Sequence, residues 1–162
     1  MEIERKFTIK QLPDALDSFP HHEIEQAYLN TDPVIRIRRQ DDDYYFTYKG
    51  SGMMSREEYN LPLNEASYRH LLEKADGNII SKTRYVIPVR QPVFTPNFVP
   101  PDKTELFIEL DVFKAPFAPL IMAEVEFPSV EMANAFIAPD WFLEDVTHDP
   151  AYHNSNMSRR TF

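Results

Sequence analysis

The sequence predicts an α+β protein in which an antiparallel sheet of eight strands closes into a barrel, with charged side chains inside and helices packed outside. Two observations predict it. Segments with a charged residue at every second position recur along the chain, at 2–6, 35–38, 55–59, 82–85, 108–112 and 124–127. Within a segment the charges mostly share one sign, whereas strands that face solvent usually mix Thr, Ser, Gln and Lys. A charged barrel lumen explains both observations.

The first of these segments, Met1-Glu2-Ile3-Glu4-Arg5-Lys6, is the most informative. Successive side chains of a strand point to opposite faces, so Glu2, Glu4 and Lys6 share one face. Residues two apart lie about 6.6 Å apart along a strand, which allows both carboxylates to bind one cation. A single E-x-E-x-K run is also what the solvent face of an ordinary edge strand shows. The recurrence of charges at every second position in the other segments favours a lumen.

The positions expected to face this lumen carry as many acids as bases. The acids are Glu2, Glu4, Glu58, Glu109, Asp111, Glu124 and Glu126. The bases are Lys6, Arg36, Arg38, Lys49, Arg56, Lys82 and Arg84. Because burying a charge in dry protein costs several kcal/mol per ion, we expect all of them to line a wet cavity that ions and ligand fill.

Turn and cap residues delimit the remaining elements of the first half of the chain. Pro13 near its start indicates a short helix over 13–19. His21 and His22 are expected in the following turn, without a metal. Strands are expected over 25–29, 34–39, 44–49 and 53–61. The run Asp41-Asp42-Asp43 lacks the spacing of a calcium loop and indicates a solvated hairpin tip.

In the second half, apolar residues at helical spacing predict a helix over 64–75, with Asn64 as its N-cap and Gly77 as its stop. A strand is expected over 79–89. Five prolines then fall between positions 88 and 101, which no central strand tolerates. Ser129 is the expected N-cap of a helix over 129–137. Residues 152–157 are expected to close one mouth of the tunnel, and Arg159 and Arg160 to be solvated.

Composition narrows the class of protein. The 162 residues suit a single domain over 1–162, and a hydrophobic fraction of 43% with 12 Phe suffices for a core. There is no cysteine, which excludes disulfides and thiolate metal sites. The net charge of -9 disfavours general binding of nucleic acid. No segment resembles a signal peptide or the ~20 apolar residues of a membrane span, so we expect a cytoplasmic protein.

The charged segments together resemble the CYTH superfamily, also called triphosphate tunnel metalloenzymes. The resemblance is carried by Glu2-x-Glu4-x-Lys6, Arg36 with Arg38, Lys49, Lys82-x-Arg84, Glu109-x-Asp111 and Glu124-x-Glu126. It extends to Pro139-Asp140-Trp141 and to Asp145-Val146-Thr147-x-Asp149-x-x-Tyr152-x-Asn154, which look like the short, single-domain bacterial branch.

The resemblance implies a role for each group of residues. Glu2, Glu4 and Glu126, supported by Glu124, are the implied ligands of Mg²⁺ or Mn²⁺ and, with Lys6, the catalytic set. The bases Lys6, Arg36, Arg38, Lys49, Arg56, Lys82 and Arg84 would hold the phosphates of a small-molecule triphosphate. Glu58, Glu109 and Asp111 would orient these bases and, with Glu124, are candidates for a second metal site. The number of metal ions and the oligomeric state, with a homodimer as one option, stay open.

The expected activity is metal-dependent hydrolysis of triphosphates, with inorganic tripolyphosphate as the favoured substrate. A class IV adenylate cyclase or a thiamine triphosphatase would use the same fold. A polyphosphate-binding module without catalysis is the alternative of another class, but pure polyanion binding gains nothing from so many carboxylates. The proline-rich insertion at 88–101 is a lid, an interface or a passive loop.

Overall fold

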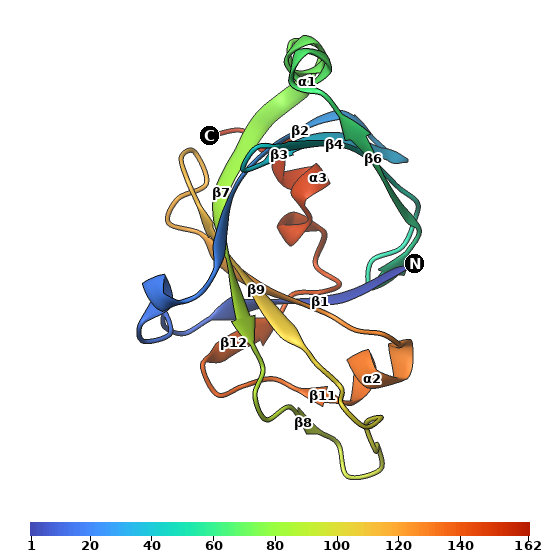
Figure 1. Cartoon of the computed structure of the whole chain (residues 1–162), viewed down its shortest axis with the longest axis vertical. Helices are drawn as coiled ribbons and strands as arrows, with labels where there is room; N and C mark the ends of the chain where they lie inside the picture. The colour runs from blue at the N-terminus through green and yellow to red at the C-terminus, as the bar shows by residue number, and fades with distance from the viewer.

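The computed structural model describes residues 1–162, and its main element is a nearly closed antiparallel barrel seen end-on in Figure 1. The neighbouring strands are β1 (Glu2–Ile9), β10 (Ile121–Glu126), β9 (Phe107–Phe113), β7 (Asp76–Pro88), β2 (His21–Thr31), β3 (Val34–Gln40), β4 (Asp43–Lys49) and β6 (Glu58–Leu63). The ring closes where β5 (Ser55–Arg56) pairs with β1. Because β5 and β6 form one strand interrupted at Glu57, the barrel confirms the predicted fold.

The alternation of β1 separates the lumen from the main core. Ile3 and Phe7 point outward into a buried cluster that includes Met132 of α2 (Val130–Ala135). Arg5 also lies on this outer face, where it donates to the carbonyls of Ala133 and Phe136 at 2.9 and 2.8 Å. The outer face of β1 therefore anchors α2, while its inner face is left for chemistry.

The longer helices cover the outside of the barrel, as expected (Figure 1). Helix α1 (Glu65–Leu72) packs Tyr68 against Ile37, and the Asn64 side chain caps it by accepting from Ser67 N at 2.7 Å. The helix ends at Leu72, so the predicted stop at Gly77 is wrong; Gly77 lies in β7 with φ 73°. None of the helices is long and apolar enough to cross a membrane.

The small helix α3 (Asn154–Met157) behaves differently, because it lies within the ring of strands in Figure 1. Its Met157 is buried in an apolar cluster with Ile80, Phe113 and Met122. These three residues precede or follow the charged lumen positions of β7, β9 and β10 at strand spacing. Apolar side chains therefore fill one end of the barrel interior, and charged side chains line the rest.

The proline-rich insertion packs against the outer wall of the barrel. Its β8 (Val93–Phe94) pairs with β11 (Phe136–Ile137), which follows α2. The Phe94 ring lies 6.2 Å from that of Phe136 and contributes to the main core cluster. Figure 1 shows this small sheet beside α2, away from the ring. The segment is thus part of an outer layer.

Several predicted boundaries are wrong. The expected helix over 13–19 is only a 3₁₀ turn, η1 (Leu16–Ser18), and His21 and His22 begin β2 instead of forming a turn. The helix expected to reach residue 137 ends at Ala135. The chain then continues through β12 (Phe142–Asp145), which pairs with β1, and η2 (Pro150–Tyr152). Local sequence patterns did not reveal these short pairings, which depend on distant partners.

Candidate active site

A cavity of about 300 Å³ occupies the charged part of the barrel, and no hydrophobic residue lines it. Its lining residues are Glu2, Glu4, Lys6, Arg36, Arg38, Gln40, Lys49, Glu58, Arg84, Glu109, Glu124, Glu126 and Asn154. Eleven of these 13 were expected from the sequence. Gln40 was missed, although it continues the period-two pattern of Arg36 and Arg38. Asn154 was missed as well, because α3 brings it into the barrel from the far end of the chain.

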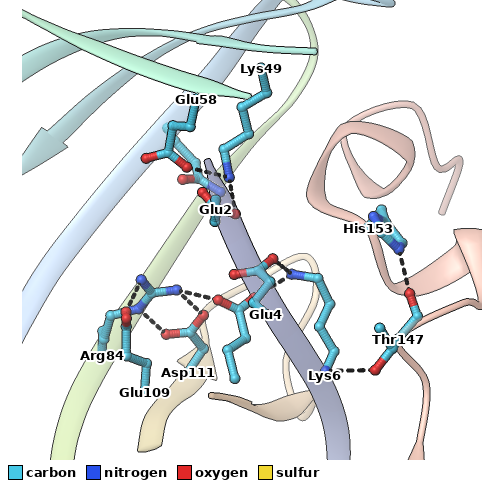
Figure 2. Close-up of polar contacts among 12 residues, drawn as sticks. Glu2, Glu4, Lys6, Lys49, Glu58, Arg84, Glu109, Asp111, Thr147 and His153 are labelled. Carbon is cyan, nitrogen blue, oxygen red and sulfur yellow. Dashed lines mark hydrogen bonds and ion pairs between the residues drawn. The ribbon is translucent and has the colours of Figure 1, made fainter. Parts of the chain in front are cut away.

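The carboxylates on β1 and β10 that line the cavity, Glu2, Glu4, Glu124 and Glu126, form an acidic wall. Lys6 holds two of these carboxylates together. Its Nζ lies 2.7 Å from Glu124 Oε1 and 2.9 Å from Glu4 Oε1 (Figure 2). Burial opposes the charge of Glu4, but the ammonium groups of Lys6 and Lys49 outweigh it and lower the pKa of Glu4 to about 2. Glu4 is therefore ionised at neutral pH, as a metal ligand must be.

Lys49 joins Glu2 and Glu58 in the same way on the neighbouring part of the wall. Its Nζ lies 2.9 Å from Glu2 and 3.2 Å from Glu58 (Figure 2). Burial and the nearby charge of Arg36 lower the pKa of Lys49 to about 7 in spite of these carboxylates. A polyanion in the cavity would favour the charged form of this lysine.

Arg84 is the centre of a third network, in which its guanidinium contacts three acids. It donates to both oxygens of Asp111 at 2.7 and 2.8 Å and to Glu124 at 2.9 Å, and it pairs with Glu109 (Figure 2). Burial works against its charge, but Asp111 and Glu109 raise the pKa of Arg84 further above its usual value. The side chain is fixed in place before any ligand binds.

Two of the expected lumen residues form a dry ion pair instead of lining the cavity. Lys82 and Asp111 are both 0% exposed, with Lys82 Nζ 2.7 Å from Asp111 Oδ2. Burial lowers the pKa of Lys82 to about 8 despite this carboxylate. The expectation that every lumen charge needs a wet cavity is therefore wrong for this pair. The opposite charges stabilise each other, and the hydrogen bonds from Arg84 to Asp111 stabilise the pair further.

Arg56 also lies apart from the main cavity. It is the Cα partner of Glu2 across the β5–β1 pair, but its side chain lines a neighbouring cavity next to α3. Arg159, expected to be solvated, lines that second cavity too, and Arg160 is exposed.

Arg36 and Arg38 carry positive charge that no acid neutralises. Arg36 is buried, and its Nε has no hydrogen-bond partner; Nη2 reaches only Thr47 Oγ1 at 3.4 Å. Arg38 donates to the neutral Gln26 Oε1 at 2.8 and 3.1 Å. Burial and the charges of Arg36 and Arg84 lower the pKa of Arg38 to about 9. The β3 side of the cavity therefore carries positive charge without an acidic side chain to balance it.

Glu126 shows the opposite imbalance on β10. It lines the cavity but forms no ion pair within the chain, and burial together with the carboxylates of Glu2 and Glu109 raises its pKa. No three acidic or histidine side chains gather around one point in the structure. Glu2 and Glu4 contact lysines instead, so Glu126 is the acid of this group that has no basic partner within the chain.

A chain of hydrogen bonds links the acidic wall to α3. The Lys6 backbone N–H donates to Thr147 Oγ1 at 3.0 Å. This bond lies just beyond Asp145, the last residue of β12, which is the Cα partner of Phe7 in β1. His153, immediately before α3, places its Nε2 2.9 Å from the carbonyl oxygen of Thr147 (Figure 2). Thr147 thus ties the entry of α3 into the barrel to the strand that carries Glu4 and Lys6.

Fold and cavity together define a class of protein: a barrel with a charged lumen, in which arginines without a carboxylate partner and a group of carboxylates line one cavity. The chain belongs to the CYTH domain family, whose model matches residues 1–127. This is the family of triphosphate tunnel metalloenzymes, which generally depend on a divalent metal.

The chain is similar over its whole length to proteins of known function. It is 38% identical over 161 residues to an inorganic triphosphatase of Nitrosomonas europaea, covering 97% of this chain and 96% of the relative. It is 32% identical over 169 residues to an inorganic triphosphatase of Acetivibrio thermocellus, covering 99% and 95%. The crystal structure of an inorganic triphosphatase matches with a TM-score of 0.67 at 32% identity, covering 99% of this chain and 96% of that one.

Proposed function

We propose that this protein is an inorganic triphosphatase, which hydrolyses tripolyphosphate to pyrophosphate and phosphate. The observation that carries the proposal is the pair Arg36 and Arg38, which lack a carboxylate partner and face a wall rich in acids across one cavity. The inorganic triphosphatases to which the chain is similar support the same activity. The whole of residues 1–162 would act as one catalytic domain.

The arginines suit the substrate. A guanidinium presents a planar fork of donors that matches phosphate oxygens. A linear triphosphate carries its charge along its length, so bases on different strands bind it better than bases clustered at one point. Arg36 and Arg38 on β3, Lys49 on β4, and Lys6 and Arg84 across the cavity provide such a distribution. The same donors would stabilise the negative charge that shifts onto the leaving diphosphate.

The acidic wall fits a divalent cation by the chemistry of its donors. All candidate ligands are carboxylate oxygens, which Mg²⁺ and Mn²⁺ prefer. Glu126 forms no ion pair within the chain and its pKa is raised, which supports a role for it as a ligand of a cation. Glu2, Glu4 and Glu126 would hold the ion, with Glu124 as support and Glu109 nearby for a second one. A bound ion would withdraw charge from the terminal phosphoryl oxygens during attack by water.

The lysines then take on a second role. Lys6 and Lys49 neutralise Glu4, Glu124, Glu2 and Glu58 in the structure. In the metal-bound enzyme the ammonium groups of Lys6 and Lys49 would be available to donate to the phosphate oxygens of the substrate. Asp111 keeps Arg84 oriented throughout, because it accepts from two nitrogens of that guanidinium.

A phosphate-release assay tests the proposal. Tripolyphosphate, ATP, GTP and thiamine triphosphate are compared with Mg²⁺ or Mn²⁺, while pyrophosphate and cyclic AMP are monitored. We expect tripolyphosphate to be hydrolysed fastest and activity to vanish in excess chelator. Full hydrolysis in chelator would refute the metal-dependent mechanism. Cyclic AMP as the main product from ATP would make the protein a cyclase, and binding without turnover of any substrate would make it a binding module.

A further inference from the structure

A second cavity of about 300 Å³ lies next to α3 and shares none of its lining with the catalytic cavity. It is formed by the loop that contains Ser51 and Gly52, by Arg56 of β5, and by His153 and Arg159 at the two ends of the α3 region. Asn154 lines the catalytic cavity, whereas its neighbours His153 and Ser155 line the second one. Helix α3 therefore separates the two cavities.

The charge of this second cavity is positive. The Arg56 guanidinium takes part in no ion pair and no side-chain hydrogen bond within the chain, and the Arg159 guanidinium donates only to the neutral Asn156 Oδ1, at 3.0 Å. Asp32 is the one carboxylate in the lining, and it is exposed. Two guanidinium groups thus face one acid in a protein of net charge -9, where free bases are scarce.

The loop adds neutral donors. The backbone N–H groups of Ser51, Gly52 and Met53 have no acceptor within the chain, whereas that of Gly50 is bonded to Glu57 O at 3.0 Å. Gly52 has φ 125°, and a Cβ there would lie 2.2 Å from Ser55 O, so the loop requires glycine at this position. Successive backbone N–H groups in a turn can form a concavity that binds an anion.

We propose that this second cavity is a binding site for an inorganic phosphate anion, separate from the catalytic cavity. Arg56 and Arg159 supply paired charge-assisted donors, and the 51–53 loop supplies backbone N–H groups. Phosphate is favoured over a carboxylate because its oxygens can accept from both guanidinium forks and from the loop at once. This proposal does not depend on the proposed hydrolysis, because binding of an anion in the second cavity involves no chemical step.

The three glycines of the chain allow a site-resolved test. In protein labelled with ¹⁵N-glycine, a heteronuclear NMR spectrum contains the amide signals of Gly50, Gly52 and Gly77. Gly50→Ala, where a Cβ meets only Glu57 at ordinary contact distances, assigns one signal. Orthophosphate is titrated in excess chelator. We expect the Gly52 signal to move most and saturate, and that of Gly77, which packs against the backbone of Ser158 and Arg159 but lies outside this lining, to move less.

Variants separate this site from the tunnel. Arg56→Gln with Arg159→Gln should weaken the orthophosphate titration at Gly52 at least about tenfold, because charge-assisted bonds are lost. The exposed Arg159→Gln alone should weaken it less and serves if the double variant does not fold. Arg36→Ala, in the tunnel, should leave the Gly52 titration unchanged. Pyrophosphate should act like orthophosphate, and acetate should have little effect.

Any of four outcomes would overturn the proposal. The first is a Gly52 signal that does not respond to orthophosphate. The second is an equal response in the wild type and in the arginine variants, which would show that these side chains bind no anion. The third is a response that Arg36→Ala abolishes, which would place the anion in the catalytic cavity. An equal response to acetate would refute the preference for phosphate.

Discussion

Glu4 and Glu126 face each other as Cα partners across the β1–β10 pair, but only Glu4 has an ammonium group beside it. Like charges directly opposite each other on paired strands are destabilising. The two carboxylates also differ in pKa: that of Glu4 is lowered to about 2 by lysine charges that outweigh its burial, and that of Glu126 is raised by burial and neighbouring acids. The ionised form of Glu126 therefore lowers the stability of the fold, and it is the form that the proposed metal requires.

We expect Glu126→Gln to raise the melting temperature at neutral pH in chelator by no more than about one or two degrees, because the side chain is exposed and solvent screens the repulsion, and to lower turnover at least tenfold. A carboxyl whose pKa is higher in the folded chain than in the unfolded chain destabilises the fold once pH exceeds both values. The gain should therefore grow as pH rises through the raised pKa of the folded chain and disappear as pH falls below the unfolded pKa of glutamate. Thermal melts across this range measure it, and a lower melting temperature at neutral pH would contradict the argument.

Arg36→Lys should raise the KM for tripolyphosphate about tenfold and lower turnover, and Arg36→Ala should do so more strongly. The buried Nε of Arg36 is one of the donors that await an acceptor, and lysine cannot reproduce a planar fork. Steady-state kinetics on both variants, and on the same pair at Arg38, measure the effect. Complete rescue by lysine would show that only the charge matters.

Asp111→Asn should lower the free energy of unfolding by about 3 kcal/mol, because it leaves the buried ammonium of Lys82 without its anionic partner. Urea unfolding measures the change. Glu23→Gln is the matched control: it removes the anionic partner of Lys114 in an exposed ion pair and should cost under about 1 kcal/mol. Equal losses in the two variants would mean that burial of the first pair does not matter.

Substrate length should decide turnover. Tripolyphosphate can contact the β3 arginines while its reacting end lies at the acidic wall, whereas pyrophosphate cannot span both. Binding energy from remote contacts positions the reacting end, so pyrophosphate should lose kcat as well as affinity. ATP hydrolysis should trail tripolyphosphate at least tenfold, because α3 and the apolar cluster fill one end of the barrel. Comparable kcat/KM values for the three would refute length reading.

Phe94→Ala should destabilise the protein by about 2 kcal/mol without changing the ratio of tripolyphosphate to ATP hydrolysis. Phe94 is partly buried against the main core, and its segment lies outside the ring of strands. Chemical unfolding and the two activities are measured together. Val99→Ala, at a side chain that is 85% exposed in the same insertion, should change neither. A changed substrate ratio in Phe94→Ala would indicate that the insertion acts as a lid.

Sequence periodicity predicted the side of each strand but not the depth at which each side chain lies. The alternation in β1 placed Glu2, Glu4 and Lys6 in the lumen, and the cavity confirms it. The same alternation put Lys82 in the lumen, where it is inward but dry, with the Phe113 ring of the apolar cluster 5.3 Å from its Nζ. No local pattern states how far along the barrel the solvent reaches.

The remaining errors have the same origin. Arg56 follows the period-two pattern, but α3 separates its side chain from the catalytic cavity. Asn154 contributes to that cavity only because His153 and Thr147 bring the end of the chain into the ring. The bond from the Lys6 N–H to Thr147 Oγ1 that anchors this segment joins residues 141 positions apart, and neither composition nor spacing could reveal it.

The apolar packing of Met157 against Ile80, Phe113 and Met122 has a kinetic consequence. A cavity blocked at one end admits the substrate and releases both products through the same opening. The product nearer that opening must depart before the deeper one can follow, so release is sequential. The product that leaves last then competes directly with the next substrate molecule for the empty enzyme. The product that leaves first can also rebind to the enzyme that still holds the other product.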